Sequence, residues 1–250
     1  ETAKIAVEAT LTGHLDGVTS LSFSSAGDIL ASASLDHTVR LWSTTRRECV
    51  GQLRVASARV WAVQCSPTDR TLATGSEDGA VRVWNLDTCE CLMTLRGYSN
   101  KTWSLAFSPH RSLLLAANED SLVRAWEIQD ARTEIELSGH ASRVWAVACS
   151  SDGQWVASAS DDLSVRLWDL RSGVCRHVMH GHTDWIRALA FDPRARILAS
   201  AAEDGRIILW DAATHRKLHH CQLPGLVYQV AFTPDGEHLA SANRNGTVYI

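Results

Sequence analysis

Residues 139–169 read GHASRVWAVACSSDGQWVASASDDLSVRLWD, and this stretch decides the fold. Short runs of valine, alanine and tryptophan alternate in it with turns made of serine, aspartate and glycine. It ends at Trp168-Asp169, and similar stretches recur along the chain. Their closing tryptophans keep a constant spacing of 42 residues: Trp42, Trp84, Trp126, Trp168 and Trp210. A fixed period of this length predicts an architecture of repeated supersecondary units.

Each repeat predicts four short β-strands. In the quoted copy and the residues that follow it, we expect strands over residues 143–149, 155–160, 165–168 and 174–179. Tight turns at Ser151-Asp152-Gly153 and Asp161-Asp162-Leu163 separate the first three. No helical periodicity is present in the chain. Because four strands cannot bury both faces of their own sheet, we expect the copies to stack radially on one another.

The repeat resembles a known family. Gly139-His140 near its start and Trp168-Asp169 at its end are similar to the signature of the WD40 repeat, whose copies form the blades of a β-propeller. The resemblance covers essentially the whole chain. Six copies are present, ending at Trp42, Trp84, Trp126, Trp168, Trp210 and, truncated, at Ile250. We therefore expect one domain over residues 1–250, belonging to a longer protein or complex.

The two ends of the chain predict how the ring closes. Residues 3–11 precede the first Gly-His pair as an outermost strand precedes the later ones, and the last copy stops in its third strand at residues 248–250. The N-terminal segment is thus expected to supply the missing outer strand of the last blade. The expected fold is an all-β propeller of WD40 type with six four-stranded blades closed in this way. The alternative is seven blades, one of them missing or donated by a partner.

Composition excludes several function classes. The formal net charge is −4, so no global basic field attracts nucleic acid or a membrane surface, and neither partner is expected. No apolar run is long enough to form a transmembrane helix. The seven cysteines include no Cys-x-x-Cys pair, and five of them recur in phase with the repeat: Cys49, Cys91 and Cys175 at one position, and Cys65 and Cys149 at another. This pattern favours packing roles in a reducing, cytoplasmic compartment.

No cofactor or metal is expected either. The glycines mark turns and form no phosphate-binding loop. His177 and His180 lie on a strand whose alternation splits side chains between two faces, and His182 belongs to the repeat signature, so a metal site is not predicted there or at His219 and His220.

Histidine, serine and aspartate recur in a pattern that imitates a hydrolase triad. Three copies carry the full set with a tryptophan: His14, Ser32, Asp36, Trp42; His140, Ser158, Asp162, Trp168; and His182, Ser200, Asp204, Trp210. An enzyme requires one nucleophile at one oxyanion site, so three equivalent copies argue against catalysis. The WD40 resemblance implies a structural hydrogen-bond network inside each blade, and we expect no enzyme activity.

Three copies depart from that set. Copy two has Val55-Ala56 in place of Gly-His, copy three has Tyr98 and Ala116, and the last copy has Leu223 and Asn245. We expect these blades to be held by packing more than by the network.

The resemblance also implies which residues line one mouth of the central channel. They flank the start of each innermost strand and precede each turn aspartate. At the first two positions they are Gly17 and Thr19, Arg59 and Trp61, Lys101 and Trp103, Arg143 and Trp145, Trp185 and Arg187, and Leu226 and Tyr228. At the third position they are Leu35, Glu77, Glu119, Asp161, Glu203 and Arg244.

Tryptophan, arginine and tyrosine are enriched at interaction hot spots, and arginine can stack on tryptophan. The sequence therefore predicts a non-enzymatic module that binds a peptide or protein partner at this mouth. The expected binding residues are Arg59, Trp61, Glu77, Lys101, Trp103, Glu119, Arg143, Trp145, Asp161, Trp185, Arg187, Glu203 and Tyr228. In the competing interpretation, each tryptophan packs on the next blade, and each arginine or lysine forms an ion pair with a neighbouring glutamate or aspartate.

Two other functions stay open. The propeller is an architectural subunit completed by a partner, or it is a receptor subunit of a ubiquitin ligase. The second rests on the segment Trp168-Asp169-Leu170-Arg171, which resembles a Trp-Asp-x-Arg signature.

Overall fold

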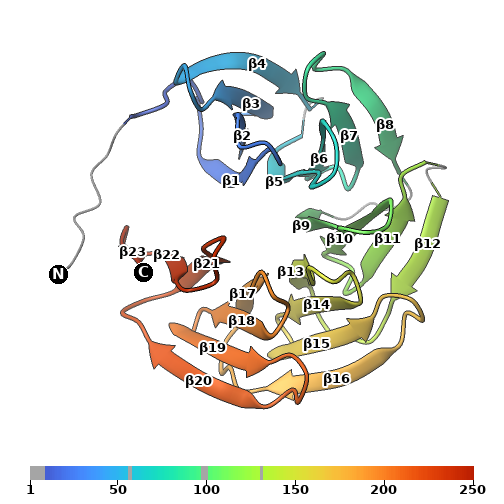
Figure 1. Ribbon diagram of the computed structural model, residues 1–250, viewed down its shortest axis with the longest axis vertical. Helices are drawn as coiled ribbons and strands as arrows, with labels where there is room; N and C mark the ends of the chain where they lie inside the picture. Colours follow the sequence, from blue (N-terminus) through green and yellow to red (C-terminus); the bar gives the residue numbers. More distant parts are fainter. Residues whose placement is uncertain (1–8, 56–57, 97–100, 130–131) are drawn as a thin grey trace.

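The computed structural model describes residues 9–55, 58–96, 101–129 and 132–250. Over these residues the chain is all-β and forms six antiparallel sheets arranged as blades around a central channel (Figure 1). The predicted six-bladed propeller is confirmed. The same residues include no helix long and apolar enough to cross a membrane.

The blades are numbered 1 to 6 in chain order, and their strands follow from the channel outward. Blade 1 is β1 (Val18–Phe23), β2 (Ile29–Ser34), β3 (Thr38–Ser43) and β4 (Glu48–Arg54); blade 2 is β5 (Val60–Cys65), β6 (Thr71–Ser76), β7 (Val81–Asn85) and β8 (Cys91–Leu95). Blade 3 is β9 (Thr102–Phe107), β10 (Leu113–Asn118), β11 (Val123–Glu127) and β12 (Arg132–Leu137); blade 4 is β13 (Val144–Cys149), β14 (Trp155–Ser160), β15 (Ser164–Asp169) and β16 (Cys175–His180). Blade 5 is β17 (Ile186–Phe191), β18 (Ile197–Ala202), β19 (Arg206–Asp211) and β20 (Lys217–Gln222); blade 6 is β21 (Val227–Phe232), β22 (Leu239–Asn243) and β23 (Val248–Tyr249).

The turns within a blade follow from their residues. In the β13–β14 turn, the Ser150 hydroxyl donates to the Asp152 carboxylate, which accepts the Gln154 amide at 2.9 Å. Gly153 takes a φ of 68°, a left-handed conformation that glycine adopts without steric cost. Such short turns connect strands that are neighbours in sequence, so every sheet is a simple meander.

The hydrophobic core lies between the blades. Five buried clusters occupy the five junctions between consecutive blades. At the junction of blades 4 and 5, Ala157 and Ala159 of β14 face Ile186 and Leu189 of β17. Small side chains on one sheet let branched side chains of the next sheet pack closely. Burying a leucine or isoleucine in this way contributes about 1.5–3 kcal/mol, so each blade is stabilised mainly by its neighbours.

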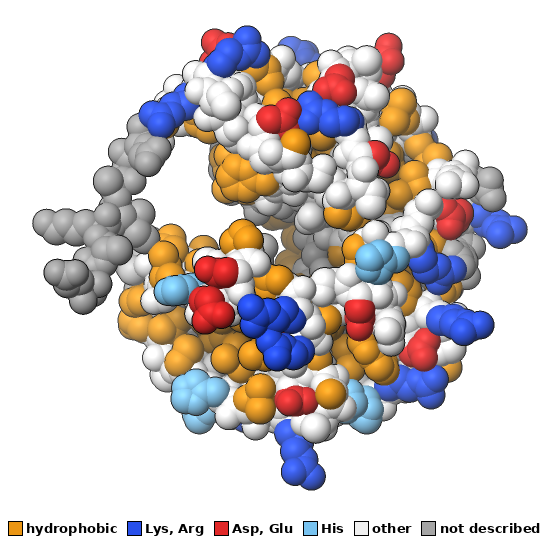
Figure 2. All heavy atoms as spheres, viewed as in Figure 1, with side chains coloured by type: hydrophobic (Ala, Val, Ile, Leu, Met, Phe, Trp, Pro, Cys, Tyr) orange, Lys and Arg blue, Asp and Glu red, His pale blue; other side chains and the backbone are white. Residues whose placement is uncertain are grey.

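Among the described residues, the first blade has no such neighbour on one side. Leu21 of β1 is 61% exposed, whereas its counterparts in the five later blades, Val63, Leu105, Val147, Leu189 and Val230, are 3–8% exposed. Val18 is exposed as well, although Val60, Val144, Ile186 and Val227 at the same position are fully buried. Figure 2 shows the ring interrupted between the blades at the two ends of the chain, with hydrophobic side chains on both borders.

The sixth blade has three strands in the described part of the chain. Five blades are therefore four-stranded, as predicted. The fourth strand predicted for blade 6 from residues 3–11 lies mostly at residues 1–8, outside the described residues, and residues 9–11 form no strand. On the other border of the interruption, Ala242 of β22 is exposed, whereas Ala33, Ala117, Ala159 and Ala201 at its position are fully buried.

The predicted hydrogen-bond network is present in blades 1, 4 and 5. In blade 4, His140 Nδ1 donates to Asp162 at 2.8 Å, and its Nε2 accepts the Ser158 hydroxyl at 2.7 Å. Ser158 Oγ in turn accepts the indole N–H of Trp168 at 2.8 Å. The same arrangement is formed by the homologous residues of the other two blades: His14, Ser32, Asp36 and Trp42, and His182, Ser200, Asp204 and Trp210.

In blades 2 and 3, whose histidine positions Ala56 and Tyr98 lie outside the described residues, a buried arginine pairs with the turn aspartate. The expectation that packing holds these blades more than the network does stays a prediction. Buried Arg82 pairs with Asp78 at 2.7 Å, and buried Arg124 pairs with Asp120 at 2.6 Å. Each aspartate keeps its place, and the guanidinium comes from the third strand of the same blade. These two ion pairs were not expected from the sequence, although arginine recurs in phase at Arg40, Arg82, Arg124 and Arg166.

Removing the shared hydroxyl should destabilise a blade. Ser158→Ala leaves the buried indole of Trp168 and Nε2 of His140 without their partner, so we expect a loss of about 1–3 kcal/mol in the free energy of unfolding. Urea denaturation measures it. Ser25→Ala, at an exposed position, is the control and should stay within about 0.5 kcal/mol of the wild type. Equal stability of both variants would show that the network contributes little.

Two histidines predict how stability depends on pH. Burial lowers the pKa of His182, although Asp204 opposes the shift. The ring of His215 stacks on that of His177 with centroids 3.4 Å apart; burial and then the neighbouring His177 lower the pKa of His215, while Asp211 opposes the shift. Both rings are thus favoured neutral in the folded state, so the unfolded chain binds more protons below the ordinary histidine pKa of about 6.5.

Stability should therefore decrease as the pH falls from about 7.5 to about 5.5. Urea midpoints measured across this range check the sign. The His182→Asn/His215→Asn variant should be less stable than the wild type at neutral pH but show a shallower pH dependence. A wild type whose stability rises on acidification contradicts this assignment.

Candidate functional site

A β-bulge interrupts the first strand of every blade at the same position. One residue has no partner on the second strand, and these extra residues are Thr19, Trp61, Trp103, Trp145, Arg187 and Tyr228. A bulge takes its extra residue out of the ladder and redirects its side chain. The fold therefore presents six in-phase side chains at the same end of the inner strands, all of them among the predicted mouth positions.

Three of these side chains form a continuous aromatic stack across blades 2 to 4, in which successive ring planes are tilted by 55° and 45°. The ring centroids of Trp61 and Trp103 are 4.9 Å apart, and those of Trp103 and Trp145 are 4.3 Å apart. All three tryptophans are half-buried. In blade 1, the Thr19 hydroxyl instead donates to the Val60 carbonyl at 2.7 Å. Each bulge side chain of blades 1 to 3 thus reaches the next blade, whatever its chemistry.

Two arginines extend the stack into blade 5. The guanidinium of Arg187 lies 3.7 Å from the ring centroid of Trp145 and 5.2 Å from that of Trp185. Arg143 approaches the same two rings at 5.3 and 5.4 Å. Cation–π contacts of this kind contribute about 0.5–2 kcal/mol each, depending on how far the groups are desolvated. The alternation of indole and guanidinium groups predicted for the mouth is thus assembled in this part of the ring.

Acidic residues pair with several of the cations. Glu77 of blade 2 pairs with Lys101 of blade 3 at 3.2 Å, Asp161 pairs with Arg143 at 2.8 Å, and Glu203 pairs with Arg187. Asp161 also accepts the indole N–H of Trp145. The interpretation of the tryptophans and bases as packing and ion-paired groups is therefore correct for these residues. It does not extend to Arg59 and Glu119, whose side chains have no ion-pair partner among the described residues.

Other mouth residues remain open to solvent. Trp185 is 39% exposed and Tyr228 is 49% exposed, and Arg59 is exposed beside the stack. The indole N–H groups of Trp61 and Trp103 are buried and have no acceptor in the described part of the chain. The mouth therefore combines an internally satisfied centre with accessible aromatic and charged groups at its border.

The channel opens differently at its other end. A cavity of about 420 Å³ is lined there by the ends of the inner strands and the turns that follow, with Phe107, Phe191, Phe232, Cys65 and Cys149 among the lining residues. Burial raises the pKa of the Cys149 thiol to about 11, so this cysteine stays protonated at neutral pH. Three phenylalanine rings thus contribute to the lining at this end of the channel, whereas ion-paired side chains line the mouth.

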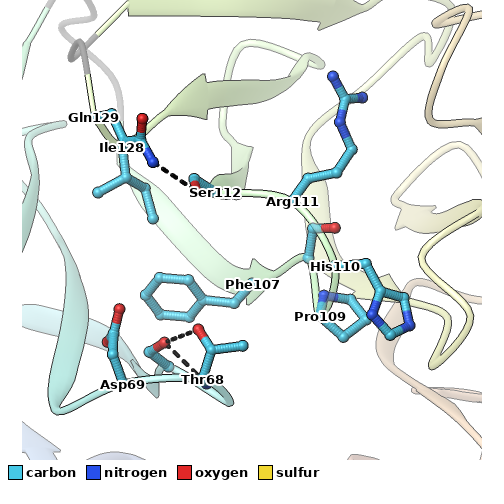
Figure 3. Close-up of a pocket in the computed structure, with 11 residues that line it drawn as sticks. Thr68, Asp69, Phe107, Pro109, His110, Arg111, Ser112, Ile128 and Gln129 are labelled. Atoms are coloured by element: carbon cyan, nitrogen blue, oxygen red, sulfur yellow. Dashed lines mark hydrogen bonds between the residues drawn. The ribbon is translucent and has the colours of Figure 1, made fainter.

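A second cavity of about 320 Å³ lies where blades 2 and 3 meet (Figure 3). Phe107 projects into it, and Gln129 donates to the Ser112 hydroxyl at 3.3 Å on one side. His110 Nε2 is within 3.0 Å of the Ser151 carbonyl of blade 4, so its imidazole makes an inter-blade contact. No group of three histidine, cysteine, aspartate or glutamate residues within the described ranges could hold a metal ion.

The segment that suggested a ubiquitin-ligase receptor forms the turn between β15 and β16. Asp169 accepts the backbone amides of Arg171 and Ser172 and pairs with Arg176 at 3.1 Å, while Leu170 is buried. These contacts account for the segment as a turn within the blade.

Comparison with known proteins agrees with this architecture. The chain matches the family described as "WD domain, G-beta repeat" at residues 6–43, 47–85, 89–127, 132–169, 173–211 and 215–250. It is similar to "WD repeat-containing protein pop2" of Schizosaccharomyces pombe (strain 972 / ATCC 24843), with 41% identity over 58 residues. That similarity covers 23% of this chain and 8% of the relative. The second to sixth matches each run from the outer strand of one blade through the first three strands of the next. Because six copies of the family's repeat cover the chain, it belongs to the WD40 family of β-propellers, a general class of protein-interaction modules.

Proposed function

We propose that this propeller is a non-enzymatic module that binds a peptide or protein segment across the mouth formed by the six bulges. The observation that carries the proposal is the set of tryptophan, arginine and tyrosine side chains that the bulges bring together there. Large aromatic side chains with one exposed edge are the groups that most often anchor protein partners. Trp185 and Tyr228 are of this kind.

The fold itself does not require these residue types. Blade 1 builds the same bulge with Thr19, preceded by Gly17, and its side chain still contacts the next blade. The aromatic and basic residues of the other blades thus exceed what the backbone needs. The serines of the triad-like sets support a non-catalytic role, because Ser158 is fully buried and its oxygen is occupied by His140 and Trp168.

Loss of the accessible aromatics should abolish binding. The probe is a library of random peptides displayed on phage, selected on the wild-type domain. We expect Trp185→Ala/Tyr228→Ala to lose most selected peptides and to change the free energy of unfolding little, since both side chains are partly exposed. The control is Leu92→Ala, at an exposed position of β8 on the perimeter, which should retain them. Retention by both variants means that the mouth is not the binding surface.

A second candidate function is favoured by the exposed border of blade 1. The chain is then an architectural subunit whose ring is completed by a blade from a partner. Leu21 and Val18 expose the face that each later blade buries against its predecessor, and Ala242 exposes the complementary face on blade 6. Exposed apolar faces of this kind commonly mark interaction surfaces.

Substituting aspartate at the equivalent residues Leu21 and Val147 distinguishes the exposed face of blade 1 from the buried face of blade 4. Leu21→Asp should change the free energy of unfolding by less than about 1 kcal/mol, because its side chain is already in water. Val147→Asp should unfold the domain, because it places an unpaired carboxylate in the junction of blades 3 and 4. Urea denaturation measures both.

The architectural role further requires that Leu21→Asp prevent the domain from assembling with its natural complex, as detected by size-exclusion chromatography of the co-purified proteins. Assembly that is unaffected by Leu21→Asp, but lost on Trp185→Ala/Tyr228→Ala, leaves only the mouth as the interaction surface.

A further inference from the structure

The ion pairs around the mouth change direction between blades. In blade 2 the acid reaches forward, since Glu77 pairs with Lys101 of blade 3. In blades 4 and 5 the acid pairs within its own blade, Asp161 with Arg143 and Glu203 with Arg187. Blades 2, 4 and 5 all carry an acid and a base at the equivalent positions. They differ in whether the carboxylate pairs with the base of its own blade or with that of the next blade.

Blade 3 stands at the point where the direction changes. If Glu119 reached forward as Glu77 does, its partner would be Arg143 of blade 4. Arg143 is taken by Asp161, whose short side chain is 5% exposed and also accepts the N–H of Trp145. Glu119 is therefore left without a cation among the described residues.

In blade 2 it is a cation, Arg59, that has no ion-pair partner in the described part of the chain. A forward-reaching acid for Arg59 would come from blade 1, where the position holds Leu35, and the acid of its own blade, Glu77, is engaged by Lys101. Arg59 is exposed and has no acidic partner within the described ranges. Over the residues that the structure describes, the adjacent blades 2 and 3 thus carry an unpaired cation and an unpaired anion at the mouth, and the further unpaired cation, Arg244, belongs to blade 6.

The two unpaired charges flank one pair of stacked rings. Arg59 precedes Trp61 by two residues, and the backbone amide of Glu119 donates to the carbonyl of Lys101, which precedes Trp103 by two. Between them lie the Trp61–Trp103 contact and the Glu77–Lys101 ion pair, both already satisfied. An arginine and a carboxylate that are solvated in the free protein can form charge-assisted hydrogen bonds with a ligand without first breaking an internal pair.

We propose that the mouth selects a peptide segment with one acidic and one basic side chain, the acidic one for Arg59 and the basic one for Glu119. An uncharged stretch between them lies over the Trp61–Trp103 pair. This rests on the proposed function, because it specifies the ligand of the same mouth. A purely acidic or purely basic segment would place a like charge against Glu119 or Arg59, which opposes its binding.

The test uses synthetic capped peptides with one lysine and one glutamate, in both orders and separated by neutral spacers of increasing length. In matched peptides leucine replaces the lysine, the glutamate or both, and in a further peptide glutamate replaces the lysine. Isothermal titration calorimetry with the wild-type domain should show that the best doubly charged peptide binds about tenfold more tightly than either singly charged one. Glu119→Lys should remove the preference for lysine and favour the peptide in which glutamate replaces it.

Two controls accompany these variants. Glu237→Lys makes the same charge change on the exposed β21–β22 turn, away from the bulges, and should leave every preference unchanged. Thermal melts of Glu119→Lys should match the wild type, because Glu119 forms no internal ion pair.

The outcomes separate the two proposals. Peptides that bind the wild type, lose binding on Trp185→Ala/Tyr228→Ala and ignore Glu119→Lys and Arg59→Glu would overturn the charge selection and keep the mouth as the site. Binding that ignores all four substitutions, or no binding by any peptide of the set, would overturn both. A swapped preference in Glu119→Lys, with none in Glu237→Lys, is the result expected here.

Discussion

The packing of each inner strand on the second strand of the preceding blade is the constraint on which the rest of the structure depends. A four-stranded sheet of this size has two apolar faces and no core of its own, so its neighbours supply the buried surface. Alanines on one face and branched aliphatic side chains on the other make the contact close and give it a direction around the ring. Every other feature is built on that stack. The histidine–serine–tryptophan networks stiffen single blades, and the bulges direct side chains into the mouth.

The same constraint explains why the two ends of the chain differ from its middle. Blades 2 to 5 have a neighbour on both sides, and their inner strands are buried. Blade 1 and blade 6 each have one face without a partner in the described part of the chain, and the exposure of Leu21 follows from this. A sheet of matching shape that covered this exposed face of blade 1 would stabilise it. The exposed border of blades 1 and 6 and the mouth of the channel are therefore two separate surfaces. The border is apolar and flat, whereas the mouth is aromatic and charged.

Much of the fold could be predicted from the sequence, because a period of 42 residues repeats both the strands and the turn residues between them. The networks around Trp42, Trp168 and Trp210 were predictable for the same reason, since each partner recurs in phase. The ion pairs of Arg82 and Arg124 with their turn aspartates were not predicted, because arginine occurs at the same position (Arg40 and Arg166) in blades that keep the histidine. The repeat therefore shows that an arginine recurs at this position, but not which partner it takes in each blade.

The mouth was predicted in composition but not in geometry. The residues that gather there were expected from the resemblance to the WD40 family, whose mouth positions were carried onto each copy of the repeat. The bulge that turns Trp61, Trp103 and Trp145 out of the ladder depends on strand pairing instead. The choice of ion-pair partner depends on side-chain length and on competition between neighbours, as Arg143 shows by pairing with Asp161 and leaving Glu119 free. Such choices are three-dimensional and arise only once the blades are placed side by side.

Hydrogen–deuterium exchange of the domain, free and bound to its tightest display-selected peptide, tests the central claim that binding takes place at the bulged mouth. Bulged residues lack a regular ladder partner, so their amides should exchange readily in the free protein. The account predicts new protection at residues 59–62, 101–104, 143–146, 185–188 and 226–229 when the peptide binds. Protection confined to β1, β22 and β23 would contradict it and would place the partner at the open border of the ring.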